Sequence, residues 1–296
     1  MNQRHTHSSR HKHRLWAVFA LSTTFMVIQV AAGWWTGSLA LLADAAHLFV
    51  DAAGVGLSLL AVWFAERPAT PEKTYGYYRV EILAALLNGV ILCVVALVIL
   101  FEAWERMRRP QEVLAGPVLI VAVAALGVNL LAAWLLHAGA GESLNVRSAY
   151  LEVLGDALSS AAVIAAAGVI LLTGWTTADA LASAAIGLLI LPRTVTLLRQ
   201  AVNVLLEGVP PHLDLGQIET ALLAATGVRR VHDLHVWTLT SGREAMSAHV
   251  VVEPGTPADK ILEELHVILH ARFGIDHTTL QIETESPSLL QISPRS

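Results

Sequence analysis

Four ionisable side chains stand in two pairs inside strongly apolar segments. His47 and Asp51 are four residues apart in LLADAAHLFVDAAGVGLSLLAVWF, and Glu152 and Asp156 have the same spacing in YLEVLGDALSS. Residues four apart lie on one face of an α-helix, so the two members of a pair can act at one point. A charge at the centre of a bilayer costs about 2.5–3.5 kcal/mol on insertion scales, which makes such residues candidates for a functional site.

Binding of a divalent cation is the chemistry that suits these four residues. Neither short motif contains Lys or Arg, so three carboxylates and an imidazole must either be protonated or hold a cation. One imidazole nitrogen and three carboxylate oxygens suit a divalent transition metal in tetrahedral coordination. A role in helix packing is the alternative for each aspartate taken singly. Asp44 is predicted to join the ligands, to cap its helix or to face water. Asp179 is predicted to be interfacial.

Six apolar segments are long enough to cross a bilayer, which requires about 20 residues. They cover about 15–35, 39–64, 80–102, 116–138, 148–173 and 177–198. At 1.5 Å per residue, Asp51 lies about 18 Å from the outer start of its span, and Asp156 lies about 12–15 Å from the inner start of its own. In a hydrocarbon core of roughly 30 Å, the two pairs therefore reach a similar depth from opposite sides.

The composition also indicates a membrane protein. The 296 residues are 55% hydrophobic and only 15% charged, whereas soluble domains carry about 25% charged residues. The net charge of −5 provides no basic field for nucleic acid. The single cysteine, Cys93, excludes an intrachain disulfide and a zinc site built on cysteines.

Basic residues in the short loops predict the orientation, because Lys and Arg favour the cytoplasmic side. With the N-terminus inside, the inner side carries Arg4, Arg10, Lys12, Arg14, Arg67, Lys73, Arg79, Arg147, Arg193 and Arg199, and the outer side carries Arg106, Arg108 and Arg109. Both termini are therefore predicted to be cytoplasmic. The histidines of the N-terminal tail are predicted either to capture metal or to belong to a basic tail that only fixes topology.

The chain is predicted to have a membrane domain followed by a small cytoplasmic domain. The expected division is a His-rich N-terminal tail at 1–14, a six-helix transmembrane domain at 15–205, an α+β domain at 206–285 and a tail at 286–296. Within the α+β domain the pattern predicts the order α-β-β-α-β: a helix over about 211–226, strands at 228–240 and 245–254, a helix at 256–274 and a strand at 277–283. Strand alternation places His232 and His235 on opposite faces.

The order of these motifs resembles the cation diffusion facilitator family over nearly the whole chain. The motifs are GSLALLADAAHLFVDA, YGYYRVEILAALLNG, SAYLEVLGDALSS, VHDLHVWTLTSG and AMSAHVVVE. Glu152 stands where many zinc-selective members have His, and in this the chain resembles the bacterial cobalt–zinc–cadmium resistance branch. The resemblance implies a cytoplasmic domain with a metallochaperone-like fold.

The resemblance also implies an activity and further sites. It implies a homodimer in the inner membrane that exports Zn²⁺, with Cd²⁺ or Co²⁺ as alternatives, in exchange for protons. It implies a regulatory metal site at His232, His249 and Glu283, and an interdomain ion pair between Arg79 and Glu207. Some members have His where this chain has Gln281, which leaves open whether the regulatory site holds one ion or two.

Two other classes of function compete with an antiporter. An intramembrane metalloprotease would require a motif such as HExxH, which does not occur in this chain. A metal sensor could use the cytoplasmic domain alone, but it would not require paired carboxylates within the membrane. The sequence therefore favours a transporter over an enzyme or a sensor.

Overall fold

The chain divides into two compact units in a computed structural model that describes residues 4–65, 67–137 and 144–284. One unit, the helical unit, comprises Met1–Leu60 and Ala84–Leu198, and the other, the α+β unit, comprises Ala61–Leu83 and Arg199–Ser296. The predicted tail at 286–296 and the histidine side chains of the N-terminal segment lie outside the described part of the chain.

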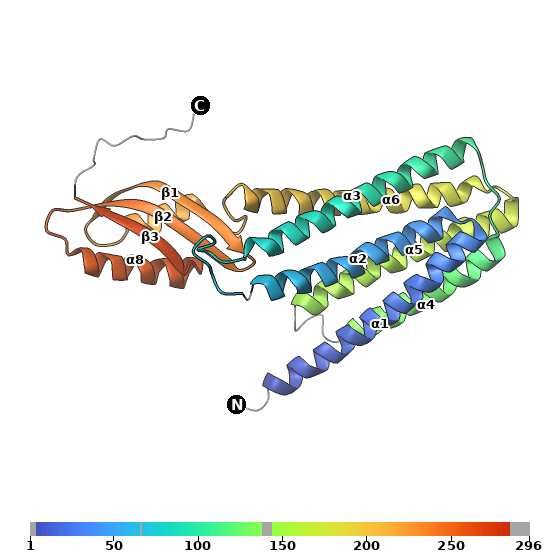
Figure 1. The fold of residues 1–296 in the computed structure, drawn as a ribbon, viewed down its shortest axis with the longest axis horizontal. Helices are drawn as coiled ribbons and strands as arrows, with labels where there is room; N and C mark the ends of the chain where they lie inside the picture. The colour runs from blue at the N-terminus through green and yellow to red at the C-terminus, as the bar shows by residue number, and fades with distance from the viewer. Residues whose placement is uncertain (1–3, 66, 138–143, 285–296) are drawn as a thin grey trace. The chain divides into compact units, whose positions relative to one another are not determined.

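Six long helices account for all the predicted membrane spans (Figure 1). They are α1 (Arg4–Thr36), α2 (Leu39–Ala65), α3 (Arg79–Arg108), α4 (Ala115–His137), α5 (Leu144–Thr173) and α6 (Thr177–Leu205). All six are long and apolar enough to cross a membrane. Helix α1 begins at Arg4, within the segment that the sequence analysis assigns to the N-terminal tail, and α3 and α6 extend several residues beyond their predicted ends.

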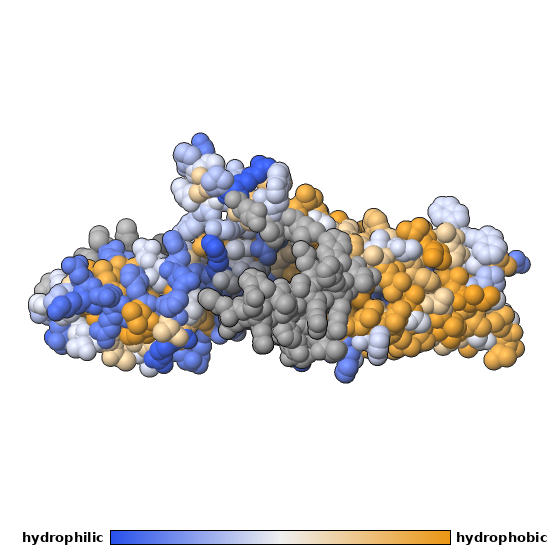
Figure 2. Space-filling view, turned by 90° about the horizontal axis from the view of Figure 1, so that it is seen from below, coloured by the Kyte–Doolittle hydropathy of each residue, from blue (hydrophilic) through white to orange (hydrophobic). Residues whose placement is uncertain are grey.

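Small residues allow the helices of the helical unit to approach closely. Its buried core is rich in Ala, Val and Ile and includes Ala43, Ala96, Ala122 and Ala167. A Cβ atom on Gly89 of α3 would lie only 2.9 Å from Cδ2 of Leu198 in α6, so a larger residue would force this leucine to shift. Figure 2 shows that hydrophobic side chains cover much of the described surface of this unit. Such an exterior suits a lipid environment.

The α+β unit has the predicted order of elements after α6. They are α7 (Leu215–Leu223), β1 (Val228–Thr240), β2 (Arg243–Val252), α8 (Ala258–Phe273) and β3 (His277–Glu283). Strand β2 lies in the middle of the sheet, antiparallel to β1 and parallel to β3. Helix α7 is shorter than predicted because the Asp214 side chain accepts from the backbone N–H groups of Gly216 and Gln217, so the helix begins at Leu215.

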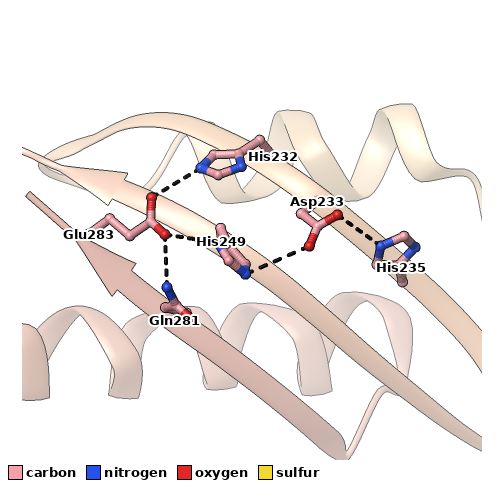
Figure 3. A network of polar contacts seen from close by, with 6 residues as sticks. All are labelled: His232, Asp233, His235, His249, Gln281 and Glu283. Carbon is pink, nitrogen blue, oxygen red and sulfur yellow. Dashed lines mark hydrogen bonds and ion pairs between the residues drawn. The ribbon is translucent and has the colours of Figure 1, made fainter. Parts of the chain in front are cut away.

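The sheet has one apolar face and one polar face. Met246, Ala248 and Val250 of β2 pack in the core of the unit with buried residues of both helices. Successive side chains of a strand point to opposite faces, so Ser247 and His249 lie on the face away from this core. Histidines and carboxylates of the strands gather on this polar face (Figure 3).

Candidate metal sites

The helical unit brings the two predicted pairs together. Nε2 of His47 lies 3.4 Å from Oδ2 of Asp51 and 3.9 Å from Oδ1 of Asp156. Asp51 and Glu152 lie close enough for their carboxyl groups to interact. Helices α2 and α5 therefore contribute one pair each to a single group of side chains, which we call the membrane cluster. Contact between two carboxyl groups requires a shared proton or a nearby cation.

Several buried polar atoms of the membrane cluster have no hydrogen-bond partner among the described residues. They are Nδ1 of His47, Oδ2 of Asp51 and Oδ1 of Asp156, and Oδ1 of Asn88 has none either. Asn88 lies against Gly54 of α2, where an added Cβ would come within 2.5 Å of its Nδ2 atom. Because buried polar groups are almost always paired, unpaired acceptors gathered at one place suit the binding of a cation.

Solvent exposure of the membrane cluster increases toward the start of α5. The exposed fraction of the side chain is 5% for Asp156, 12% for His47, 24% for Asp51 and 33% for Glu152. In the opposite direction, Asp44 is only 1% exposed. Among the described residues, the cluster is therefore more exposed on the side where α5 begins, which we call its open side, than on the side where α2 begins.

Arg193 of α6 lies at the open side, and the sequence analysis did not include it in the site. Its Nη2 atom is 3.7 Å from Oε1 of Glu152. Neither motif contains Lys or Arg, but the fold brings this arginine to the cluster from another helix. Glu152 lies near the start of α5 and Arg193 lies in the second half of α6, so no local spacing in the sequence could have indicated the contact.

Two further membrane aspartates have structural partners. Asp44 does not face water: Oδ2 accepts a 2.6 Å hydrogen bond from Nε2 of buried Gln29 in α1. Asp179 lies in the first turn of α6, at the start of that span, and is only 2% exposed. It accepts hydrogen bonds from Ser38 Oγ and from the backbone N–H of Leu39, and it thus caps the start of α2 from another helix.

A second group of potential ligands lies on the polar face of the sheet in the α+β unit. One ligand atom each from His232, His249 and Glu283 lies within 4.8 Å of the others. Nε2 of His232 is 3.1 Å from Glu283 Oε2, and Nδ1 of His249 is 2.8 Å from Glu283 Oε1 (Figure 3). Two imidazoles and a carboxylate are suitable zinc ligands.

The electrostatics of this group favour an ionised carboxylate. Burial acts to raise the pKa of Glu283, but hydrogen bonds from His232 and His249 outweigh it and hold the pKa below the ordinary value of 4.5. Gln281 also donates to Oε1 of Glu283 at 2.9 Å. A carboxylate that stays ionised near neutral pH is ready to bind a cation without first losing a proton.

A bulge in β1 overturns the prediction that His232 and His235 lie on opposite faces. His232 pairs with His249 and His235 pairs with Ser247, so the two histidines share one face. Asp233 provides the extra residue and has a φ of 52°, a left-handed conformation that Asp tolerates better than most residues. Its carboxylate lies 3.1 Å from Nε2 of His235 and 3.7 Å from Nε2 of His249. Asp233 is thus placed to orient the His249 ring.

The α+β unit also contains the start of α3 and the residues that follow α6. Nη2 of Arg79 lies 2.8 Å from Oε1 of Glu207, whose φ is 59°. Glu81, in the first turn of α3, accepts hydrogen bonds from Thr240 and Ser241 at the β1–β2 turn. The sequence analysis missed the role of Glu81, because its partners are more than 150 residues away along the chain.

Comparison with known proteins identifies the family. Residues 15–206 match the cation efflux transmembrane domain, and residues 210–285 match the cytoplasmic domain of cation efflux proteins. The metal cation efflux system protein CzcD of Cupriavidus metallidurans is 43% identical over 94% of this chain and 89% of its own length. The cadmium, cobalt and zinc/H⁺–K⁺ antiporter of Bacillus subtilis is 38% identical over 90% of this chain and 88% of its own.

One solved structure also matches part of the chain. The metal-bound C-terminal domain of the CzcD transporter is 42% identical and covers 24% of this chain and 99% of that domain, with a TM-score of 0.23.

Six candidate membrane spans, a small α+β domain and these family matches identify a multi-span membrane transporter of cations rather than an enzyme. The chain belongs to the cation efflux family, which is the cation diffusion facilitator family, and its C-terminal domain is cytoplasmic.

Proposed function

We propose that this protein exports divalent metal ions from the cytoplasm in exchange for protons. Zn²⁺ is the main substrate, with Cd²⁺ and Co²⁺ as further substrates, and the transport site consists of His47, Asp51, Glu152 and Asp156. The observation that supports this proposal best is the convergence of His47 with Asp51 and Asp156 from two helices. Unpaired buried acceptors at the same place give it further support.

Proton exchange follows from the chemistry of the ligands. Imidazole and carboxylate groups bind a metal ion only when they are deprotonated, so metal binding releases protons and protonation promotes metal release. The cluster is open on the side where α5 begins, which is the cytoplasmic side when the C-terminal domain is cytoplasmic. Metal therefore binds from the cytoplasm, and protons that enter from outside displace it after the site reopens there. Glu152 in place of a histidine makes the site harder and more anionic, which suits several divalent metals.

The orientation and assembly complete the proposal. Both termini are cytoplasmic and the protein lies in the inner membrane, as the Lys and Arg distribution in the loops favours. The protein acts as a homodimer in which each protomer carries a complete transport site.

The cytoplasmic domain senses the metal that the membrane domain exports. Zn²⁺ binds to His232, His249 and Glu283 when its cytosolic concentration rises, and stabilises the α+β domain. The Arg79–Glu207 ion pair links the start of α3 to the end of α6. Because both helices continue into the membrane domain, this link provides a path between the regulatory site and the transport site.

Metal uptake into proteoliposomes under an imposed pH gradient tests the proposal. Wild-type protein is compared with Asp51→Ala and Asp156→Ala, and with Glu102→Gln as a matched control. Glu102 is a carboxylate of the helical unit that pairs with Arg106 outside the cluster. We expect zinc uptake to follow the gradient, to be lost in both aspartate variants and to persist in the control.

Two outcomes would reject the proposed function. Normal transport by either aspartate variant would show that the membrane cluster is not the transport site. Zinc binding without transport by the wild-type protein would favour a sensor. Repeating the assay with Cd²⁺ and Co²⁺ ranks the substrates.

A further inference from the structure

Arg193 is a cation within a membrane span that contacts a ligand of the proposed transport site. It lies in the second half of α6, directly after Pro192, and Nη2 is 3.7 Å from Oε1 of Glu152. Charged residues within spans usually have a functional partner nearby. Among the ion pairs of the described residues, this one connects an arginine with the membrane cluster.

Arg193 lies at the open side of the cluster, where it can influence the access of a metal ion to the ligands. Its side chain is 54% exposed and that of Glu152 is 33% exposed, whereas Asp156 is 5% exposed. A metal ion that approaches from this side therefore meets the guanidinium group before it meets the deeper ligands.

We propose that Arg193 is an internal competitor of the metal ion for Glu152. The inference rests on the proposed transport function. Without metal, the guanidinium group pairs with Glu152 and partly neutralises an otherwise anionic cluster. When a divalent cation binds, Glu152 exchanges the guanidinium group for the metal, and Arg193 moves away because two cations cannot share one carboxylate without repulsion.

This competition has a clear consequence for affinity and rate. Arg193 lowers the affinity of the empty site for metal, and the returning guanidinium group helps to displace the ion during release. An ion site must bind well enough to fill and weakly enough to empty. Loss of the arginine should therefore tighten binding and slow turnover.

A double-mutant cycle with zinc binding as the readout tests the competition. Full-length protein in detergent carries His249→Ala throughout to remove a ligand of the cytoplasmic group, so that differences in zinc binding between the variants report the membrane site. Zinc affinity is measured by competition with a chromophoric chelator for the parent, Arg193→Gln, Glu152→Gln and the double variant. We expect Arg193→Gln to bind zinc about fivefold more tightly, the size expected for a partly exposed charge pair near 4 Å. In the Glu152→Gln background the same change should have a much smaller effect.

A charge-preserving variant distinguishes competition from a structural role. Arg193→Lys keeps the positive charge and should retain nearly the parent affinity, while Arg193→Gln should also reduce the rate of zinc transport in proteoliposomes. Unchanged zinc affinity in Arg193→Gln would overturn the inference and make Arg193 an interfacial anchor. An equal gain in zinc affinity with Glu152 and with Gln at position 152 would also overturn the inference, because such a result would indicate that Arg193 repels the metal without competing for Glu152.

Failure of this inference can be separated from failure of the transport proposal. Asp51→Ala is measured in the same His249→Ala background. If Asp51→Ala removes zinc binding while Arg193→Gln changes nothing, only the role of Arg193 is rejected. If Asp51→Ala leaves zinc binding intact, the membrane cluster is not the transport site and both proposals fail.

Discussion

Replacement of Asp179 by alanine should destabilise the helical unit much more than removal of an ordinary helix cap. Asp179 of α6 is 2% exposed. Oδ1 accepts a hydrogen bond from Ser38 Oγ at 2.5 Å, and Oδ2 accepts from the backbone N–H groups of Leu39 and Ala40 at 2.6 and 3.3 Å. The first N–H groups of a helix have no partner within the helix. The start of α2 therefore depends on a side chain from another helix.

The expected magnitude follows from the number of buried donors. A buried donor that loses its partner costs about 1–3 kcal/mol, and hydrogen bonds to a charged group contribute about 1.5–3 kcal/mol each. The Ser38 hydroxyl can rotate toward another acceptor, so the two backbone donors dominate. We expect Asp179→Ala to lower the free energy of unfolding by about 3–5 kcal/mol. The matched control is Asp214→Ala in α7, an exposed cap whose donors can turn to water, for which we expect about 1 kcal/mol.

Thermal unfolding of the purified, metal-free protein in detergent measures both changes. A loss of 3–5 kcal/mol in the helical unit corresponds to a decrease in Tm of roughly 10 °C, and the control should lose a few degrees at most. Asp179→Asn, which keeps one acceptor oxygen, should fall between the wild type and Asp179→Ala. Equal shifts for Asp179→Ala and Asp214→Ala would refute the reasoning, because they would show that the start of α2 does not require its buried partner.

Three further predictions concern the α+β unit. Arg79→Glu and Glu207→Arg should each reduce metal transport, and the double exchange should restore it. The free energy of unfolding should change by only about 0–1 kcal/mol, because both groups are exposed. Failure of the double variant to recover transport would argue against a linking role. Because the folded pKa of Glu283 lies below 4.5, its contribution to stability is complete above pH 4.5 and is lost as the pH falls through the folded pKa. The acid decrease in Tm of the metal-free protein should accordingly be smaller for Glu283→Gln, and an identical pH profile would contradict this. Zinc at a hundred times its Kd should stabilise this unit by about 2.7 kcal/mol, a gain measurable as a shift in Tm that should disappear in His249→Ala.

Local sequence patterns were sufficient to predict the helices and strands and to single out the two pairs of candidate ligands. The four-residue spacing of His47 and Asp51 places both on one helix face whatever the rest of the chain does. Long apolar segments predict membrane spans because a helix of about 20 apolar residues crosses the bilayer and satisfies its backbone hydrogen bonds internally. The strands of the α+β domain followed from their β-branched and aromatic residues, and β1 and β3 have the predicted bounds.

Contacts between distant segments of the chain determined the features of the sites that residue spacing did not predict. The pairing of Arg193 with Glu152 and the capping of α2 by Asp179 depend on how helices pack, and no periodicity within one helix contains that information. The bulge at Asp233 moved His235 to the face of His232, because one added residue reverses the alternation of every side chain that follows. The sequence by itself determined which residues are candidate metal ligands and on which element each lies. The tertiary structure alone decided which of them meet, and which cation already stands beside them.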